Sequence, residues 1–271
     1  MSFKTLLIHV RSDLASDDAL RTAVAFAQSQ DANLIGLGAR ARILVEDPGL
    51  AYLDGTTLQA IVDQEVRDGA ETHKRFSTLT RALGERAHWR ARRDFPTTAL
   101  IEEAAGADII LAGLEREPSD VGIDVATIVC ESGLPVLALP PGGDELRLRS
   151  IVVAWRNTRE ARRALSCALP LLKQAEQVHL LQVAPVRDAD EAWAGLNAAV
   201  ARLARHGVKA SAETRPCADA AAEALLDEGQ ARAADLLVVG AYGHSRAREW
   251  VLGGVTKALL AGSSIPLFLA H

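Results

Sequence analysis

The chain has 271 residues, 49% of them apolar and 24% charged, with a formal net charge of −5 at pH 7. This length leaves room for two domains of ordinary size, and no apolar run approaches the roughly 20 residues that span a bilayer, so we expect no membrane partner. The acidic balance argues against a nucleic-acid partner, and three widely separated cysteines predict neither a disulfide framework nor a zinc site, which favours a cytoplasmic protein.

The first half of the chain alternates short apolar runs with helical patterns. Five runs predict buried strands of a parallel sheet; they cover Thr5–Val10, Asn33–Gly38, Arg86–Ala91, Asp108–Gly113 and Leu134–Leu139. Helices are predicted over Asp18–Gln28, over Thr57–Leu83 and from Pro96 to about Ala105. The segment from Pro140 to Gly143 holds two prolines and two glycines and is the clearest linker in the chain.

After the linker the same pattern restarts. Five further strands are predicted, over Ile151–Trp155, Val178–Val183, Val208–Glu213, Asp235–Gly240 and Ile265–Ala270. The helices between them are predicted over Arg159–Gln174, Glu191–His206 and Ala218–Ala233, and from about Val255 onward.

The two halves match each other in sequence. Ala107–Gly113 corresponds to Ala234–Gly240, and Ser132–Leu139 corresponds to Ser263–Ala270. Strands that alternate with helices indicate parallel β-α-β units, so we predict an α/β fold of two tandem doubly wound domains, residues 1–140 and 145–271, each with a five-stranded parallel sheet. The last strand of each half carries a proline near its start, and we expect these two edge strands to lie together between the halves.

The segment from Gly240 to Thr256 contains the best candidate for a ligand site. A buried strand ends at Gly240, Gly243 follows, and Gly253-Gly254 precede the last helix. Glycines let a ligand approach the main chain, and the unpaired amides of a helix start suit phosphate. The same glycines could simply end a strand and begin a helix, so the spacing alone leaves both interpretations open.

The spacing Gly240-x2-Gly243-x9-Gly253 resembles the ATP-binding signature of universal stress proteins, and the resemblance extends over nearly the whole chain, as in a tandem member of that family. It implies a Rossmann-like fold of the adenine nucleotide alpha hydrolase type and a stress-response role with non-catalytic binding of ATP, with or without Mg²⁺. It also implies a pseudo-dimer within the chain and leaves a homodimer open. The implied site comprises Trp155, Arg156, Gly240, Gly243, His244, Gly253, Gly254, Val255 and Thr256.

Two positions depart from the family pattern. Gly254 stands where the family has Ser or Thr, and the nearest hydroxyl is that of Thr256. Arg156 stands where members commonly have an Asp that contacts the adenosine end of the nucleotide. Arginine cannot accept hydrogen bonds from ribose or adenine, although it could stack on a base or reach phosphate. The phosphate end of the implied site is therefore the better supported.

The first half lacks the glycines of this signature. Gly113 has no second glycine three residues on, and the acidic residues that follow would repel a triphosphate; these are Glu115, Glu117, Asp120 and Asp124. We therefore interpret this half as structural.

Two other functions are weighed against ATP binding. One is a nucleotide-free interaction module whose loop is a relic. The other, less favoured, is a nucleotide-using enzyme, for which only His244 and Ser245 stand near the loop. No catalytic sequence motif such as a Walker A loop or a nucleophile elbow occurs, so no catalytic residue is assigned.

Overall fold

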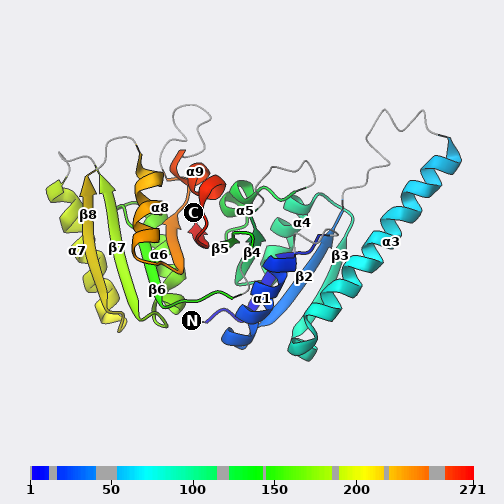
Figure 1. Cartoon of the computed structure of the whole chain (residues 1–271), viewed down its shortest axis with the longest axis horizontal. Coiled ribbons are helices and arrows are strands. Elements are labelled where there is room, and N and C mark those ends of the chain that lie inside the picture. Colours follow the sequence, from blue (N-terminus) through cyan, green and yellow to red (C-terminus); the bar gives the residue numbers. More distant parts are fainter. Residues whose placement is uncertain are drawn as a thin grey trace.

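The computed structural model describes residues 2–11, 17–40, 54–114, 122–142, 145–184, 189–216, 220–243 and 254–271. Its strands form one mostly parallel sheet with helices on both faces (Figure 1). The strands are β1 (Thr5–His9), β2 (Asn33–Ala39), β3 (Ala87–Arg92), β4 (Ile109–Gly113), β5 (Val136–Leu139), β6 (Ser150–Ala154), β7 (Gln177–Ala184), β8 (Ala210–Pro216), β9 (Leu236–Gly240) and β10 (Leu267–Ala270).

The helices alternate with these strands along the chain. They are α1 (Asp17–Gln30), α3 (Gly55–Leu79), α4 (Pro96–Glu103), α5 (Val125–Glu131), α6 (Arg159–Leu172), α7 (Ala189–Arg205), α8 (Ala221–Ala231) and α9 (Gly254–Gly262), with 3-10 turns η3 (Arg81–Arg86) and η4 (Ala104–Gly106). Within the described residues, no helix has both the length and the apolar character that crossing a bilayer requires.

The strand order of the sheet is β3-β2-β1-β4-β5-β10-β9-β6-β7-β8. All pairs are parallel except β5 with β10, which are antiparallel, with Leu267 opposite Ala138 and Phe268 opposite Leu137. The predicted α/β class with five parallel strands in each half is confirmed, as is the expectation that the last strands of the halves lie together. The halves do not form two separate sheets, however, because this pairing joins all ten strands into one.

The matched Ala-Asp segments of the two halves have a common structural role. Asp108 Oδ2 accepts hydrogen bonds from the amides of Lys4 and Thr5, at 2.7 and 2.9 Å. Asp235 Oδ2 accepts from Arg149 and Ser150 in the same way, at 2.8 and 2.9 Å. Each carboxylate thus satisfies backbone donors at the start of the first strand of its half, which stabilises the neighbouring strands in register.

The core consists of two layers, one on each face of the sheet. Strands that are apolar throughout bury side chains on both faces, as parallel sheets do. Helices α1, α3, α6 and α7 contribute to one apolar cluster, and α4, α5, α8 and α9 contribute to the other. Each cluster contains residues of both halves, and the ring of Phe268 in β10 lies 6.2 Å from that of Phe3. The core therefore continues across the junction.

Helix α3 packs on the sheet through few residues. The sequence predicts it to run on to Leu83, whereas the structure ends it at Leu79 and begins η3 at Arg81. Only Thr72 and Phe76 are buried in it. A side chain on Gly36 of β2 would collide with the Phe76 ring, at 2.4 Å, so that glycine provides the space in which α3 docks.

Candidate functional site

A pocket of about 360 Å³ lies at the carboxyl ends of β6 and β9. The two strands are parallel neighbours, with Ala154 opposite Val239, so the segments that follow them emerge side by side. The strand order reverses at this point, which is where open α/β sheets bind ligands.

The pocket brings together most of the residues proposed from the sequence. Those that line it are Trp155, Arg156, Gly240, Gly243, Gly254, Val255 and Thr256. The other two, His244 and Gly253, lie outside the described residues. The structure also adds an apolar wall that the sequence did not point to, because its members come from other strands and helices; they include Leu181 and Val183 of β7 and Leu225 of α8.

The start of α6 packs closely against Gly240 and Gly243 and leaves little room for a side chain at either position. A Cβ atom on Gly240 would lie 2.4 Å from the amide nitrogen of Ala161 and 2.7 Å from its Cα. A Cβ atom on Gly243 would lie 2.7 Å from Oε2 of Glu160. Neither glycine has a positive φ; the left-handed residue of this turn is Tyr242, with φ of 57°. The two glycines therefore serve close packing against a helix, in addition to any role toward a ligand.

The turn after β9 is held by hydrogen bonds on both sides. The amide of Ala241 donates to the carbonyl of Ala270 at 2.9 Å, and Nδ1 of His271 lies 3.0 Å from the carbonyl oxygen of Ala241. The amide of Tyr242 donates to Oγ1 of Thr256 at 3.4 Å. Thr256 is 4% exposed, so its hydroxyl supports the turn as well as facing the pocket region.

The phenol of Tyr242 is uncharged at neutral pH. Burial, and to a lesser degree the nearby acidic groups of Cys130 and Asp124, raise the pKa of Tyr242 to about 12. Both of those groups belong to α5 and its cap, in the first half of the chain. The tyrosine therefore adds no charge to the pocket that it lines.

Helices α5 and α9 occupy matched places in the two halves of the chain, but they begin with different residues. Asp124 caps α5 and accepts hydrogen bonds from the amides of Ala126 and Thr127, at 3.0 and 3.3 Å. In the matched sequences Val255 takes the place of Asp124, so α9 begins without that carboxylate. A Cβ atom on Gly254 would meet nothing within 4 Å. The space beside Gly254 is thus open, whereas amides in the first turn of α5 are already occupied by Asp124.

The sequence did not predict α5 as a helix. The segment of sequence before α5 is rich in acidic residues, and we interpreted these residues only as a source of repulsion toward phosphate. The available signal was Asp124 followed three residues later by Thr127, since an Asp that precedes an apolar run is a favoured helix cap.

The pocket carries little charge. Arg156 is exposed and is the one charged residue among the described residues that line it. Within the described part of the chain, no group of three or more His, Cys, Asp or Glu side chains could hold a metal ion. An exposed cation, the start of a helix and an apolar wall together favour an organic anion.

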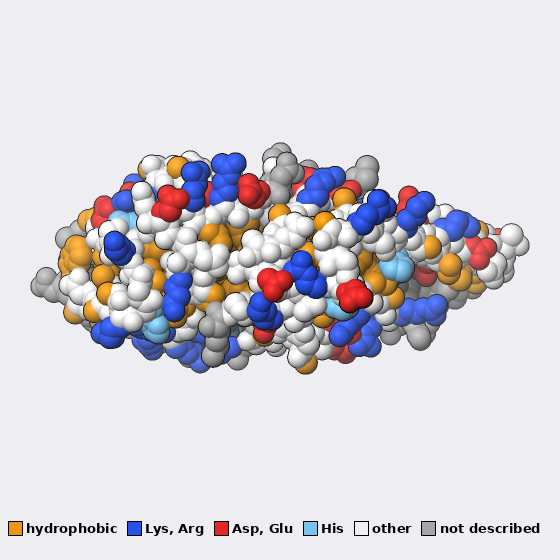
Figure 2. Space-filling model, turned by 90° about the horizontal axis from the view of Figure 1, so that it is seen from below, with side chains coloured by type: hydrophobic (Ala, Val, Ile, Leu, Met, Phe, Trp, Pro, Cys, Tyr) orange, Lys and Arg blue, Asp and Glu red, His pale blue; other side chains and the backbone are white. Residues whose placement is uncertain are grey.

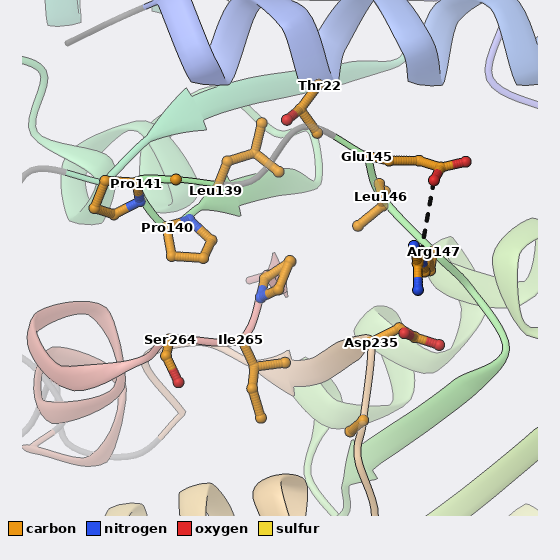
Figure 3. Close-up of a pocket in the computed structure, with 13 residues that line it drawn as sticks. Thr22, Leu139, Pro140, Pro141, Glu145, Leu146, Arg147, Asp235, Ser264 and Ile265 are labelled. Atoms are coloured by element: carbon orange, nitrogen blue, oxygen red, sulfur yellow. Dashed lines mark ion pairs between the residues drawn. The ribbon is translucent and has the colours of Figure 1, made fainter.

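A second cavity of about 250 Å³ lies at the junction, between the linker and β10 (Figure 3). It is lined by Leu139, Pro140, Pro141 and Ile265, and by the ion pair between Glu145 and Arg147, whose charged atoms are 3.6 Å apart. Both members of the pair are well exposed, and the carboxylate of Asp235 nearby already accepts two amides. The charged groups that line this cavity are thus engaged with each other or with the backbone.

The face of the molecule seen in Figure 2 carries basic and acidic side chains along its whole length. Histidine and apolar side chains are interspersed among them. This mixture agrees with the net charge of −5 and differs from the single basic stripe that is typical of nucleic-acid-binding proteins.

Comparison with known proteins gives consistent results. The model of the universal stress protein family matches residues 147–271. A universal stress protein of Synechocystis sp. is 34% identical over 90 residues, which are 33% of this chain and 31% of that protein, so the match spans about a third of the relative's length.

Solved structures resemble the whole chain. A universal stress protein from Archaeoglobus fulgidus superposes with a TM-score of 0.77 at 16% identity, over 98% of this chain and 95% of that one. A functionally unknown protein from Pseudomonas aeruginosa gives a TM-score of 0.61 at 16% identity, over 99% of this chain and 92% of that one. At such identities these structures show the fold, which both halves of the chain share.

Proposed function

We propose that the chain is a stress-response protein of the universal stress protein family, whose model matches residues 147–271, and that it binds ATP without catalysing its turnover. The observation that carries the proposal is the pocket at the ends of β6 and β9. It joins the glycine turn, the start of α9 and Arg156 in one cavity of about 360 Å³.

The lining of this cavity has parts that suit the two ends of a nucleotide. Its apolar residues, which include Leu181, Val183 and Leu225, can cover a base. Gly254 and Val255 lie at the start of α9, where helix amides favour phosphate oxygens. The guanidinium of Arg156 can pair with phosphate or stack on the base.

Any Mg²⁺ at this site would be coordinated through the phosphates of ATP. None of the described residues that line the pocket has a carboxylate to coordinate it, and hard divalent cations prefer carboxylate and other oxygen ligands. The proposal therefore includes ATP with or without Mg²⁺ and assigns no residue to the metal.

The same proposal gives the first half a structural role, since Asp124 already occupies the helix start that would bind phosphate. It includes the division of the chain into domains 1–140 and 145–271, arranged as a pseudo-dimer about the β5–β10 pair. We place the protein in the cytoplasm because its three cysteines are odd in number and widely separated.

Identification of the bound ligand tests the proposal most directly. The purified protein is denatured, and released small molecules are identified by mass spectrometry; the apo protein is then titrated with ATP by calorimetry. We expect an adenine nucleotide to be released and ATP to bind at one site per chain. Absence of released nucleotide together with no heat of binding would favour the nucleotide-free interaction module.

Turnover is measured in a separate assay. Because no general base is assigned near the phosphates, we expect phosphate release from ATP far below about 1 per second, the lower end of ordinary enzyme rates. Steady release at that rate or faster, abolished in His244→Ala, would show that the protein is an enzyme.

A further inference from the structure

Glu160 is a buried carboxylate that the ATP-binding proposal does not use. It is the second residue of α6, is 4% exposed, and packs directly beneath the glycine turn. A Cβ atom added to Gly243 would lie 2.7 Å from its Oε2 and 3.2 Å from its Cδ. The carboxylate is therefore in contact with the backbone of a residue that lines the pocket.

This carboxylate is ionised at neutral pH. Burial tends to raise the pKa of Glu160, but hydrogen bonds from Arg159, from its own amide and from Thr158 outweigh burial and lower the pKa overall. Its ion-pair partner Arg159 has a side chain that is 73% exposed, whereas that of Glu160 is 5% exposed. Water screens the exposed cation more strongly than the buried anion, so a net negative field remains beneath Gly243.

Two helix starts border the pocket, and they differ in the charge that lies at each. At the start of α6, Oγ1 of Thr158 accepts from the amide of Ala161 at 3.3 Å, and Glu160 adds a negative charge within the first turn. That full negative charge exceeds the roughly half-unit positive charge at the N-terminal end of the helix. At the start of α9, Gly254 faces open space. A phosphate group is therefore attracted to α9 and repelled from the Gly243 side.

We propose that Glu160 is a specificity-determining residue of this pocket, which excludes phosphate from the Gly243 side, confines it to the start of α9 and weakens binding as the number of phosphates grows. This assignment rests on the proposed nucleotide site. It gives the pocket a preference among adenine nucleotides that the glycine spacing does not specify.

The substitution Glu160→Gln removes the charge and keeps the size of the side chain, so its contact with Gly243 is preserved. Calorimetric titration with ATP, AMP and adenosine should show that ATP binds about tenfold more tightly to the variant than to the wild type, AMP somewhat more tightly, and adenosine equally. The control is Glu176→Gln, which removes an exposed charge at the opposite end of the sheet and should leave all three affinities unchanged.

A second variant keeps the assignment testable if the first one is unstable. Arg159→Gln changes a well-exposed side chain and removes the partner that partly neutralises Glu160. ATP should then bind about threefold more weakly than to the wild type, with adenosine unchanged. Unfolding midpoints of all variants establish that each is folded.

The possible results separate the two proposals. Equal ATP affinity in Glu160→Gln and the wild type, or a gain that adenosine shares fully, would overturn the role of Glu160 and leave the nucleotide site standing. Failure of the wild type to bind any of the three compounds would overturn the proposed function, and the role of Glu160 with it.

Discussion

At the scale of single residues, Gly240 and Gly254 belong to one glycine-rich segment but have different surroundings. The position of Gly240 is closed by the backbone of α6, with Ala161 N at 2.4 Å from an added Cβ, whereas Gly254 has open space. Gly240→Ala should therefore destabilise the fold by about 2–3 kcal/mol, because a backbone neighbour cannot yield as a side chain can. Gly254→Ala should change stability by less than about 1 kcal/mol. Chemical denaturation of both variants tests this contrast, which equal losses of stability would contradict.

The open space at Gly254 leads to a second prediction at this scale. Gly254→Asp would put a negative charge at the start of α9, where we expect phosphate. Repulsion at about 4 Å in a partly screened site amounts to a few kcal/mol, or about a hundredfold in ATP affinity. Gly122→Asp, a change of the same kind in the corresponding connection of the first half, should leave ATP binding unchanged. Equal affinities in the two variants would place the nucleotide elsewhere.

At the scale of elements, a buried carboxylate joins α4 to the edge strand β3. Glu103 has a side chain that is 3% exposed and forms ion pairs with Arg90 and Arg92. Burial alone would raise the pKa of Glu103, but hydrogen bonds from the two arginines outweigh it and lower the pKa. Since the folded pKa lies below the unfolded one, the carboxylate stabilises the fold at neutral pH, and this contribution is lost as the pH falls through the folded value.

Glu103→Gln should therefore be less stable than the wild type by about 2 kcal/mol at pH 7, given that the two arginines are about half exposed. The difference should shrink as the pH falls below about 4.5, the ordinary value for a glutamate. Free energies of unfolding measured from pH 7 to 3 test this. The exposed neighbour Glu102→Gln is the control, and a deficit that does not vary with pH would refute the assignment.

At the scale of the whole molecule, the β5–β10 pair and both apolar clusters join the halves. We therefore expect a single cooperative unfolding transition. Phe268 is fully buried in β10 and reaches Phe3 of the first half, so Phe268→Ala should cost about 3–5 kcal/mol and destabilise both halves together. Variants that retain only Trp89 or only Trp155 report on each half by fluorescence. Two separate transitions, with only the second shifted by Phe268→Ala, would contradict this expectation.

The sequence by itself determined the α/β class, the repeat and most strand positions. Uninterrupted apolar runs such as Leu236–Val239 have few alternatives to a strand buried on both faces. It also indicated a ligand site near Gly240 and Gly243, because glycine spacing is local information. The sequence left α5 unrecognised, since the acidic residues before it obscured the helix cap at Asp124.

Only the tertiary structure decided how these parts combine. The joining of two half-sheets into one follows from the antiparallel pairing of β5 with β10, which depends on hydrogen bonds between residues more than 120 positions apart. The apolar wall of the pocket and the contact of Glu160 with Gly243 likewise come from separate elements. Periodicity and spacing describe neighbours along the chain, whereas a pocket and its charge depend on which elements pack side by side, and that is settled only when the core is buried.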